Sequence, residues 1–361
     1  MRITGFEIAE LNIELKKPFI TALRRVEEIN DIVIKVHTDS ALVGYGEACA
    51  VKAVTGTTNE ALVQDLQEVI FPALSGEKVE RKKIFERLDA CEVSAEAKAC
   101  VDIALFDLLS KEAGESLHIY LGATSSTLQT DLTISLNEVA IMRADSEQAI
   151  KEGFNLLKIK LDDDIEKNIQ RIRAINEVIP SQVKLRLDPN QALDLEGALV
   201  MLKSVKTGNL ECIEQPFGAE ETGSMKALKE KALVPVLADE SLFTAKDAEL
   251  LLREGAVDML NIKLMKSGGI SEALRISALA RKYKKSCMIG SMLEGPISLL
   301  AAAHFGLSQE TVSMADLDSP IYLKEHPLLE PFHLHAESIS LNQEAGLGID
   351  RIMSGLKLFP T

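Results

Sequence analysis

The sequence predicts an α/β fold in which a parallel barrel of βα units follows a smaller α+β domain. From about residue 130 onward, short apolar strands alternate with amphipathic helices at a near-constant period. Each of these strands ends in a polar or small residue, as expected for a barrel whose functional groups gather at one mouth. The first 120 or so residues lack this period and begin with two strand-like runs.

The N-terminal part combines strand and helix patterns. Residues 2–14 and 30–38 alternate apolar and polar side chains, as half-buried strands do. The segment "ALVGYGEA" follows, and its glycines predict a turn. Three stretches then have the apolar spacing of helices, near 58–73, 80–88 and 94–113.

The second part of the chain repeats one βα unit. Seven successive strands end at positions 24–28 residues apart, which is the length of one strand and one helix. These ends are Lys160, Asp188, Glu214, Asp239, Lys263, Gly290 or Ser291, and Asp316 or Asp318. An earlier strand at 129–136 brings the count to eight. A doubly wound open sheet is the alternative, but no Gly-rich phosphate loop follows the first strand, and its end strands would lie too far apart to share a site.

Composition and charge argue against several classes of function. The net charge of −15 disfavours nucleic acid or an anionic membrane as partner, because both bind clustered Lys and Arg. The five cysteines are scattered without C-x-x-C spacing, which indicates reduced thiols and no zinc site. The N-terminus alternates like a strand, and no stretch reaches 18 apolar residues, so we expect a cytoplasmic protein. We also expect a homo-oligomer.

Three carboxylates predict a metal site. Asp188, Glu214 and Asp239 end consecutive strands, and adjacent parallel strands lie roughly 4.8 Å apart, so the three groups can converge. Any one of them could instead cap the following helix. Three carboxylates that close repel one another unless they surround a cation, and oxygen ligands suit Mg²⁺.

Two lysines share a face of the strand "LLKIK", which otherwise looks buried. Lys158 and Lys160 are two residues apart, a pattern that in isolation is usually a solvated edge. Lys160 and Lys263, however, end the strands on either side of the carboxylate strands, so they would approach an ion from opposite sides. A substrate carboxylate on the ion would place its α-carbon between two bases, and the charge of Lys158 would lower the pKa of its neighbour. Removal of a proton from one face and its return to the other predicts a racemase or epimerase.

Five motifs together resemble the muconate-lactonizing subgroup of the enolase superfamily, over essentially the whole chain. They are "KIK" at 158–160, "LDPN", "IEQP", "ADES" and "NIKLMKSGG" from 261. The resemblance implies a modified TIM barrel of the (β/α)7β type with an N-terminal α+β capping domain. We place the capping domain at 1–125, with the C-terminal tail 325–361 packing back on it, and the barrel at 126–324.

The resemblance also implies roles for the residues already singled out. Lys160 and Lys263 would be the acid/base pair, and Lys158 would support the enolate. The Mg²⁺ ligands would be Asp188, Glu214 and Asp239. Pro189 departs from the D-A-N of many relatives but leaves the ligand in place.

The segment "MADLDSP" separates the activities of this subgroup. Asp316 and Asp318 share a face of the eighth strand, and two carboxylates beside an anionic substrate suggest a cationic partner such as a free α-ammonium. A capped strand end is the plain alternative. The D-x-D resembles the signature of dipeptide epimerases, in which it holds the N-terminal ammonium.

The resemblance extends to the substrate side chain. Arg24, in the loop "PFITALRRV", matches the position that meets the glutamate of Ala-Glu dipeptides, and Thr133 and Ser291 would also contact the substrate. L-Ala-D/L-Glu, a fragment of murein, is therefore the lead substrate, which implies a place in cell wall peptide metabolism. Relatives with similar loops accept hydrophobic dipeptides.

The sequence thus predicts a Mg²⁺-dependent dipeptide epimerase that inverts the α-carbon of the C-terminal residue by 1,1-proton transfer. N-acylamino acid racemase and o-succinylbenzoate synthase are alternatives within the subgroup. A non-catalytic barrel that binds dipeptides is an alternative of another class, and a Schiff-base enzyme is a further one. His304 lies in an apolar helix pattern, and we expect it to be a packed residue.

Overall fold

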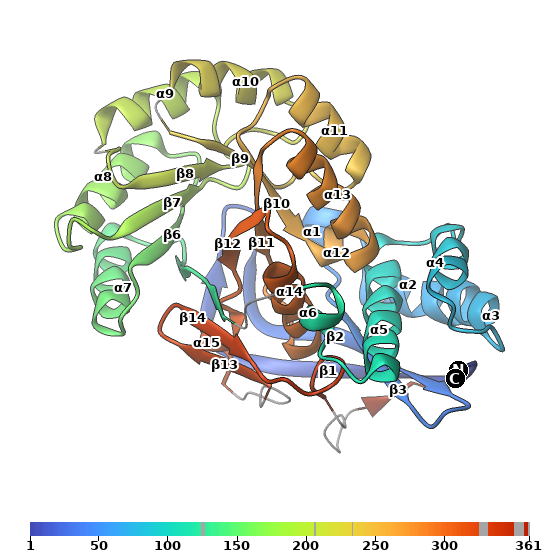
Figure 1. The fold of residues 1–361 in the computed structure, drawn as a ribbon. Coiled ribbons are helices and arrows are strands. Elements are labelled where there is room, and N and C mark those ends of the chain that lie inside the picture. Colours follow the sequence, from blue (N-terminus) through green and yellow to red (C-terminus); the bar gives the residue numbers. More distant parts are fainter. Residues whose placement is uncertain (124–126, 206, 233, 325–330, 350–356, 360–361) are drawn as a thin grey trace.

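The computed structural model describes residues 1–361 except 124–126, 206, 233, 325–330, 350–356 and 360–361. Its strands form sheets of four, eight and three strands. Figure 1 shows the eight-stranded sheet curved into a barrel with helices outside it, and the N-terminal strands and helices to one side. The predicted barrel with a preceding α+β domain is confirmed.

The N-terminal sheet is an antiparallel meander with a short C-terminal strand on its edge. Its strands are β1 (Ile3–Ile20), β2 (Arg25–Thr38), β3 (Val43–Ala48) and β15 (Lys357–Leu358). The two strand predictions are confirmed, but the predicted turn at "ALVGYGEA" is wrong, because β3 covers these glycines. A Cβ on Gly44 or Gly46 would overlap the carbonyl oxygens of Ala104 or Cys100, so glycine is needed for close packing of β3 against a helix.

The helices of this domain match the three predicted stretches. The first stretch forms α2 (Asn59–Gln64), a π-helical turn (Asp65–Ile70) and α3 (Phe71–Leu74), and the other two form α4 (Arg81–Asp89) and α5 (Ala95–Ala113). Short helices α1 (Lys52–Thr55) and α6 (Leu117–Tyr120) lie before and after them. The side chain of Ser94 caps the start of α5, and Gly114 ends it in the left-handed conformation. Helix α5 is buried on nearly all sides, against β3 and the barrel.

The barrel strands are parallel and pair in sequence order. They are β5 (Leu132–Ile134), β6 (Leu156–Lys160), β7 (Lys184–Asp188), β8 (Leu210–Glu214), β9 (Val236–Ala238), β10 (Met259–Lys263), β11 (Ser286–Gly290) and β12 (Val312–Asp316). The helices are α7 (Val139–Lys151), α8 (Ile165–Asn176), α9 (Leu195–Ser204), α10 (Thr222–Lys231), α11 (Ala245–Arg253), α12 (Leu264–Ser267), α13 (Ile270–Lys282), α14 (Pro296–Ser308) and α15 (Ser319–Tyr322). The predicted strand ends therefore lie at one mouth.

The first and last barrel strands meet largely through side chains. Between β5 and β12 the backbone makes an isolated bridge, Thr130 to Ala315. Beside it, the Leu317 N–H donates to Thr130 Oγ1 (2.8 Å), and the Thr133 N–H donates to Asp318 Oδ2 (2.6 Å). We call this junction the seam.

The C-terminal residues return to both parts of the chain. A hairpin of β13 (Phe332–His335) and β14 (Ser338–Leu341) pairs with β4 (Thr127–Gln129). The Leu347 N–H donates to Asp107 of α5 (2.8 Å). The predicted boundary between the domains falls within 124–126, outside the described residues, so the division stays a prediction. All five cysteines are free, as predicted, and all are buried. No helix in the described part of the chain is long and apolar enough to cross a bilayer.

Carboxylates of the N-terminal domain cap two barrel helices. Asp102 of α5 accepts hydrogen bonds from the Ser271 N–H (3.0 Å) and Oγ–H (2.6 Å) at the start of α13. Glu47 of β3 accepts from the N–H groups of Ile297 (2.7 Å) and Ser298 (2.8 Å) at the start of α14. Since helix N-termini carry unsatisfied donors and partial positive charge, these contacts fix how the domain docks.

Replacing Asp102 by asparagine changes how stability depends on pH. Burial raises the pKa of Asp102 to about 7, whereas an unfolded aspartate titrates near about 3.9, so the folded state retains the proton between these values. The stabilisation is complete below about pH 4 and is lost as the pH rises through about 7. Asparagine keeps an acceptor for Ser271 but carries no charge. Between pH 5 and pH 8, the free energy of unfolding should therefore fall by about 2–3 kcal/mol less in Asp102→Asn than in wild type.

Urea unfolding at the two pH values measures the difference. Asp163→Asn, at an exposed position, is the control and should follow wild type. Parallel pH slopes for Asp102→Asn and wild type would contradict the assignment.

Candidate active site

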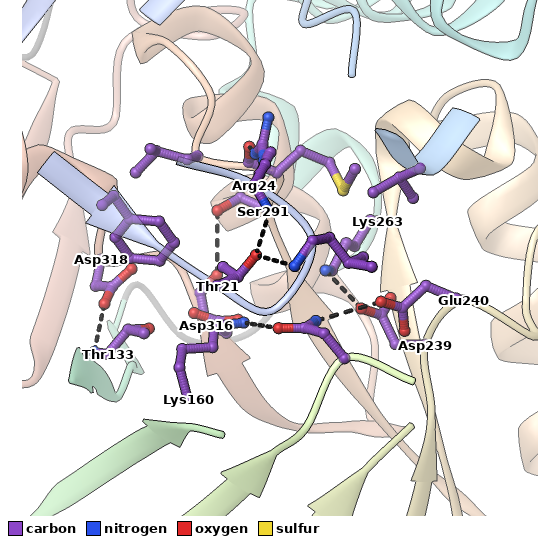
Figure 2. A pocket seen from close by; sticks show the side chains of 16 residues that line it. Thr21, Arg24, Thr133, Lys160, Asp239, Glu240, Lys263, Ser291, Asp316 and Asp318 are labelled. Atoms are coloured by element: carbon purple, nitrogen blue, oxygen red, sulfur yellow. Dashed lines mark hydrogen bonds and ion pairs between the residues drawn. The ribbon is translucent and has the colours of Figure 1, made fainter. Parts of the chain in front are cut away.

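A pocket at the barrel mouth brings together eight of the eleven site residues predicted from the sequence. Figure 2 shows their side chains around the cavity; they are Arg24, Thr133, Lys160, Asp239, Lys263, Ser291, Asp316 and Asp318. The other three, Lys158, Asp188 and Glu214, are buried and do not line the pocket. Lys158 and Asp188 pair with the lining residues Asp316 and Lys160, and Glu214 pairs with Lys158.

The loop between β1 and β2 lines one side of the pocket. Its residues Thr21 and Arg24 lie over the mouth in Figure 2. The guanidinium of Arg24 donates to the carbonyl oxygen of Met292 (2.6 Å), in the loop after β11. Ile20 is bound to the end of β5 through its N–H, which donates to Ser135 Oγ (2.7 Å). Val54, in the short helix α1, also lines the pocket.

Lys158 is the central cation of the site. Its Nζ lies 3.0 Å from Asp188 Oδ2, 2.7 Å from Glu214 Oε2 and 2.7 Å from Asp316 Oδ2. Burial alone would lower the pKa of Lys158, but the charges of these carboxylates hold it well above its usual range. The prediction that Lys158 and Lys160 share an inward face is confirmed, and carboxylates of the chain itself balance the charge of Lys158.

The two predicted bases enter from different sides of the barrel. Lys160, on β6, lies 2.5 Å from Asp188, and Lys263, on β10, lies 2.8 Å from Asp239. Strands β7, β8 and β9 separate them, and Figure 2 shows both side chains at the cavity. Burial opposes the charge of Lys263, yet the neighbouring Asp239 keeps its pKa above the ordinary value. A small molecule between these lysines would meet an amine on each side.

The three strand-end carboxylates do not cap helices. The N-cap positions of α9, α10 and α11 belong to Asp194, Glu221 and Thr244. Asp188, Glu214 and Asp239 instead turn inward, are almost wholly buried, and each pairs with an ammonium group. Burial and the charge of Asp188 raise the pKa of Glu214, whereas neighbouring lysines outweigh burial and lower the pKa of Asp188 and Asp239. These three carboxylates offer only oxygen ligands, and the Lys158 ammonium already lies between Asp188 and Glu214. Oxygen ligands of this kind fit a hard cation such as Mg²⁺.

A second carboxylate group is more compact. Among the described residues, Asp131, Asp316 and Asp318 are the three acidic groups whose oxygens all lie within 4.8 Å of one another. Each already has a partner: Arg186 binds Asp131, Lys158 binds Asp316, and the Thr133 N–H binds Asp318. The strand-end carboxylates and this second group are therefore two distinct places at which a positively charged group can bind.

The D-x-D residues differ in environment. Burial opposes ionisation of Asp316, but Lys158 outweighs it and lowers its pKa to about 2. Burial and the charge of Asp316 raise the pKa of Asp318 to about 6. Asp318 accepts from the Thr133 N–H (2.6 Å) and the Tyr322 hydroxyl (3.0 Å), so it joins the seam as well as lining the pocket. The hydroxyl of Ser291 donates to the Asp316 carbonyl (3.3 Å).

Several site residues were not predicted. Asn190 accepts a hydrogen bond from Lys160 (3.2 Å) and donates one to Glu240 (3.2 Å). Asn190 and Glu240 both line the pocket. Lys266 lies 2.5 Å from Asp239 and is fully buried. The motifs "LDPN", "ADES" and "NIKLMKSGG" contain all three, and a polar residue one to three positions after a strand end was the available signal.

His304 is not part of this site. It lies buried on α14, with Nδ1 2.9 Å from Nδ1 of His118 on α6. Burial lowers its pKa to about 3, so its ring is neutral. The prediction of a packed histidine is confirmed.

Comparison with known families agrees with this geometry. Residues 3–122 match the N-terminal domain of mandelate racemase and muconate lactonizing enzyme, and residues 141–352 match the enolase C-terminal domain-like family. The chain belongs to the mandelate racemase/muconate lactonizing enzyme family. The resemblance inferred from the motifs is confirmed.

Within this family, the chain is similar to dipeptide epimerases. It is 38% identical to the L-Ala-D/L-Glu epimerase of Clostridium acetobutylicum, over 98% of this chain and 99% of that protein. It is 35% identical to the hydrophobic dipeptide epimerase of Enterococcus faecalis, over 97% and 99% of the two chains. The substrate-liganded L-Ala-D/L-Glu epimerase of Bacillus subtilis superimposes with a TM-score of 0.95 at 34% identity, covering 98% and 100%. The dipeptide epimerase of E. faecalis, complexed with Mg and L-Leu-L-Tyr, superimposes with a TM-score of 0.93 at 34% identity, covering 96% of this chain and 99% of that chain.

Arg186 stabilises the barrel below its mouth. It is fully buried, and its guanidinium donates to Asp131 Oδ2 (2.7 Å), the Ala315 carbonyl (2.8 Å) and Glu211 Oε2 (2.6 Å). These bonds connect β7 to both sides of the seam. Burial and the charge of Asp316 raise the pKa of Asp131, and Arg186 is the main group that opposes this, so its loss would leave a buried carboxyl group without its ion-pair partner.

Arg186→Met should therefore lower the free energy of unfolding by about 3–5 kcal/mol. The double variant Arg186→Met with Asp131→Asn removes both charges and should recover much of the loss. Urea unfolding of both variants measures this. A single variant as stable as wild type would show that the ion pair does not hold the seam.

Proposed function

We propose that this protein is a Mg²⁺-dependent dipeptide epimerase that inverts the α-carbon of the C-terminal residue by 1,1-proton transfer. The observation that carries the proposal is the pocket lined by Lys160 and Lys263 from opposite sides of the barrel and by Asp316 and Asp318. Two bases suit inversion at one carbon, and two carboxylates suit a free ammonium. Similarity to named dipeptide epimerases supports the same reaction.

Binding of the substrate uses charges at two places. Asp188, Glu214 and Asp239 would hold Mg²⁺, which when bound supplies the positive charge that a substrate carboxylate and an enediolate need. Asp316 and Asp318 bind the N-terminal ammonium of the dipeptide. A dipeptide with both ends bound is fixed in orientation, with its second α-carbon over the pocket floor.

The lysines move the proton. One lysine, neutral, takes the α-proton from its side of the carbon, and the other, as ammonium, returns a proton on the opposite side. The reverse reaction exchanges these roles. Lys158 adds positive charge near the developing enolate, and Thr133 and Ser291 shape the wall beside the substrate.

L-Ala-D/L-Glu is the lead substrate. Arg24 lines the pocket and could meet a glutamate side chain, although in this structure it binds the Met292 carbonyl. Leu23, Met292 and Leu293 form an apolar wall beside it. That wall favours hydrophobic dipeptides as the second candidate class, and a relative from E. faecalis carries that name.

The cellular setting belongs to the same proposal. Action on L-Ala-D/L-Glu would place the protein in cell wall peptide metabolism, in the cytoplasm. The net charge of −15 supports a small-molecule substrate and disfavours nucleic acid and anionic membranes as partners. A homo-oligomer is the expected assembly.

Deuterium incorporation tests the reaction. In D₂O with Mg²⁺, the protein should place deuterium at the glutamate α-carbon of both L-Ala-L-Glu and L-Ala-D-Glu. Lys160→Ala and Lys263→Ala should each lower epimerisation at least about 100-fold and each retain exchange from one configuration only, opposite for the two variants. Lys246→Ala, at an exposed position, is the control.

No exchange with any member of a dipeptide library would refute the epimerase. Unchanged turnover in both lysine variants would refute these residues as the bases. N-acylamino acids that react better than free dipeptides would favour the racemase of the same subgroup instead.

Metal dependence separates the two carboxylate groups. Chelation of Mg²⁺ should abolish exchange, and Glu214→Gln should raise the Mg²⁺ concentration for half-maximal activity by about tenfold or more, because it removes a charged ligand. Asp318→Asn should leave that concentration unchanged and raise the KM for L-Ala-L-Glu, because it weakens ammonium binding. The reverse pattern would place the metal at Asp131, Asp316 and Asp318.

A further inference from the structure

Asp318 is bound on one side by the backbone of Thr133 and by Tyr322, a residue that was not predicted to belong to the site. Its Oδ2 accepts from the Thr133 N–H (2.6 Å) across the seam and lies 3.0 Å from the hydroxyl of Tyr322. Asp318 is 4% exposed and Tyr322 is 5% exposed, so little water competes with these bonds. Figure 2 shows Asp318 turned toward Thr133 at the edge of the cavity.

The ionised form of Asp318 needs donors. Asp316 lies close to it, and two buried carboxylates repel each other. Lys158 balances Asp316, at 2.7 Å, whereas the hydrogen bonds found for Asp318 come from Thr133 and Tyr322. Loss of either donor would leave the carboxylate less stable as an anion and freer to rotate.

Tyr322 is itself held firmly. Its single hydroxyl proton is shared between Asp318 Oδ2 (3.0 Å) and the Thr133 carbonyl oxygen (2.6 Å), and its ring meets Phe19 edge-on, with centroids 5.3 Å apart. Phe19 belongs to β1 and lines the pocket. The tyrosine therefore links the end of β5, the wall from the capping domain and the D-x-D carboxylate.

We propose that Tyr322 is a positioning residue of the ammonium subsite, whose hydroxyl orients Asp318 so that both D-x-D carboxylates face the N-terminus of a dipeptide. This inference rests on the proposed function and adds to it a residue that does not touch the substrate. Asp318 uses Oδ2 for both bonds, so its other oxygen is the one available to an ammonium.

The test compares two ligands in Tyr322→Phe, which keeps the ring and removes the hydroxyl. For L-Ala-L-Glu, the KM should rise about fivefold to thirtyfold, with kcat changed by less than about twofold. N-propionyl-L-glutamate has the same shape without the ammonium, and its inhibition constant against L-Ala-L-Glu should stay within about twofold of wild type. Tyr283→Phe, at the far end of α13, is the matched control and should change neither value.

A second cycle uses the Asp318 side chain itself. In the Asp318→Asn background, adding Tyr322→Phe should change the KM for L-Ala-L-Glu by less than about twofold, because the carboxylate it orients is gone. Equal losses for L-Ala-L-Glu and N-propionyl-L-glutamate would show that Tyr322 only supports the fold, and an unchanged KM would also overturn the proposal. If wild type fails to exchange any dipeptide, the proposed function fails instead, which is a separate result.

Discussion

The site depends on mutual neutralisation of buried charges at the barrel mouth. Lys158 lies within 3.0 Å of Asp188, Glu214 and Asp316, none of which is much exposed. Alone, any of these groups would be strongly destabilised away from water. Together they stabilise one another, although burial and the charge of Asp188 keep the pKa of Glu214 above its usual value.

The position of Lys158 also connects the two binding regions. Its ammonium contacts Asp188 and Glu214 on one side and Asp316 of the D-x-D on the other. Positive charge placed among the strand-end carboxylates would reduce their demand on Lys158, leaving Asp316 as its remaining partner. The region proposed for the substrate carboxylate and the region proposed for its ammonium therefore share one side chain.

Much of this could be predicted because parallel strands impose simple rules. The period of two in "LLKIK" places Lys158 and Lys160 on one face, and the βα period places strand ends at one mouth. Contacts across the molecule could not be predicted. Gly44 and Gly46 resemble a turn until α5 is known to lie against them, and Tyr322 has meaning only once the seam brings β5 beside the end of β12. The threefold pairing of Lys158 likewise depends on the register of four strands.

A crystal structure with Mg²⁺ and L-Ala-L-Glu would show how the substrate lies between the two lysines. Mg²⁺ should lie among Asp188, Glu214 and Asp239, the dipeptide ammonium at Asp316 and Asp318, and the Nζ atoms of Lys160 and Lys263 on opposite faces of the glutamate α-carbon. Both amines on the same face, or the ion bound at Asp131, Asp316 and Asp318, would contradict this arrangement.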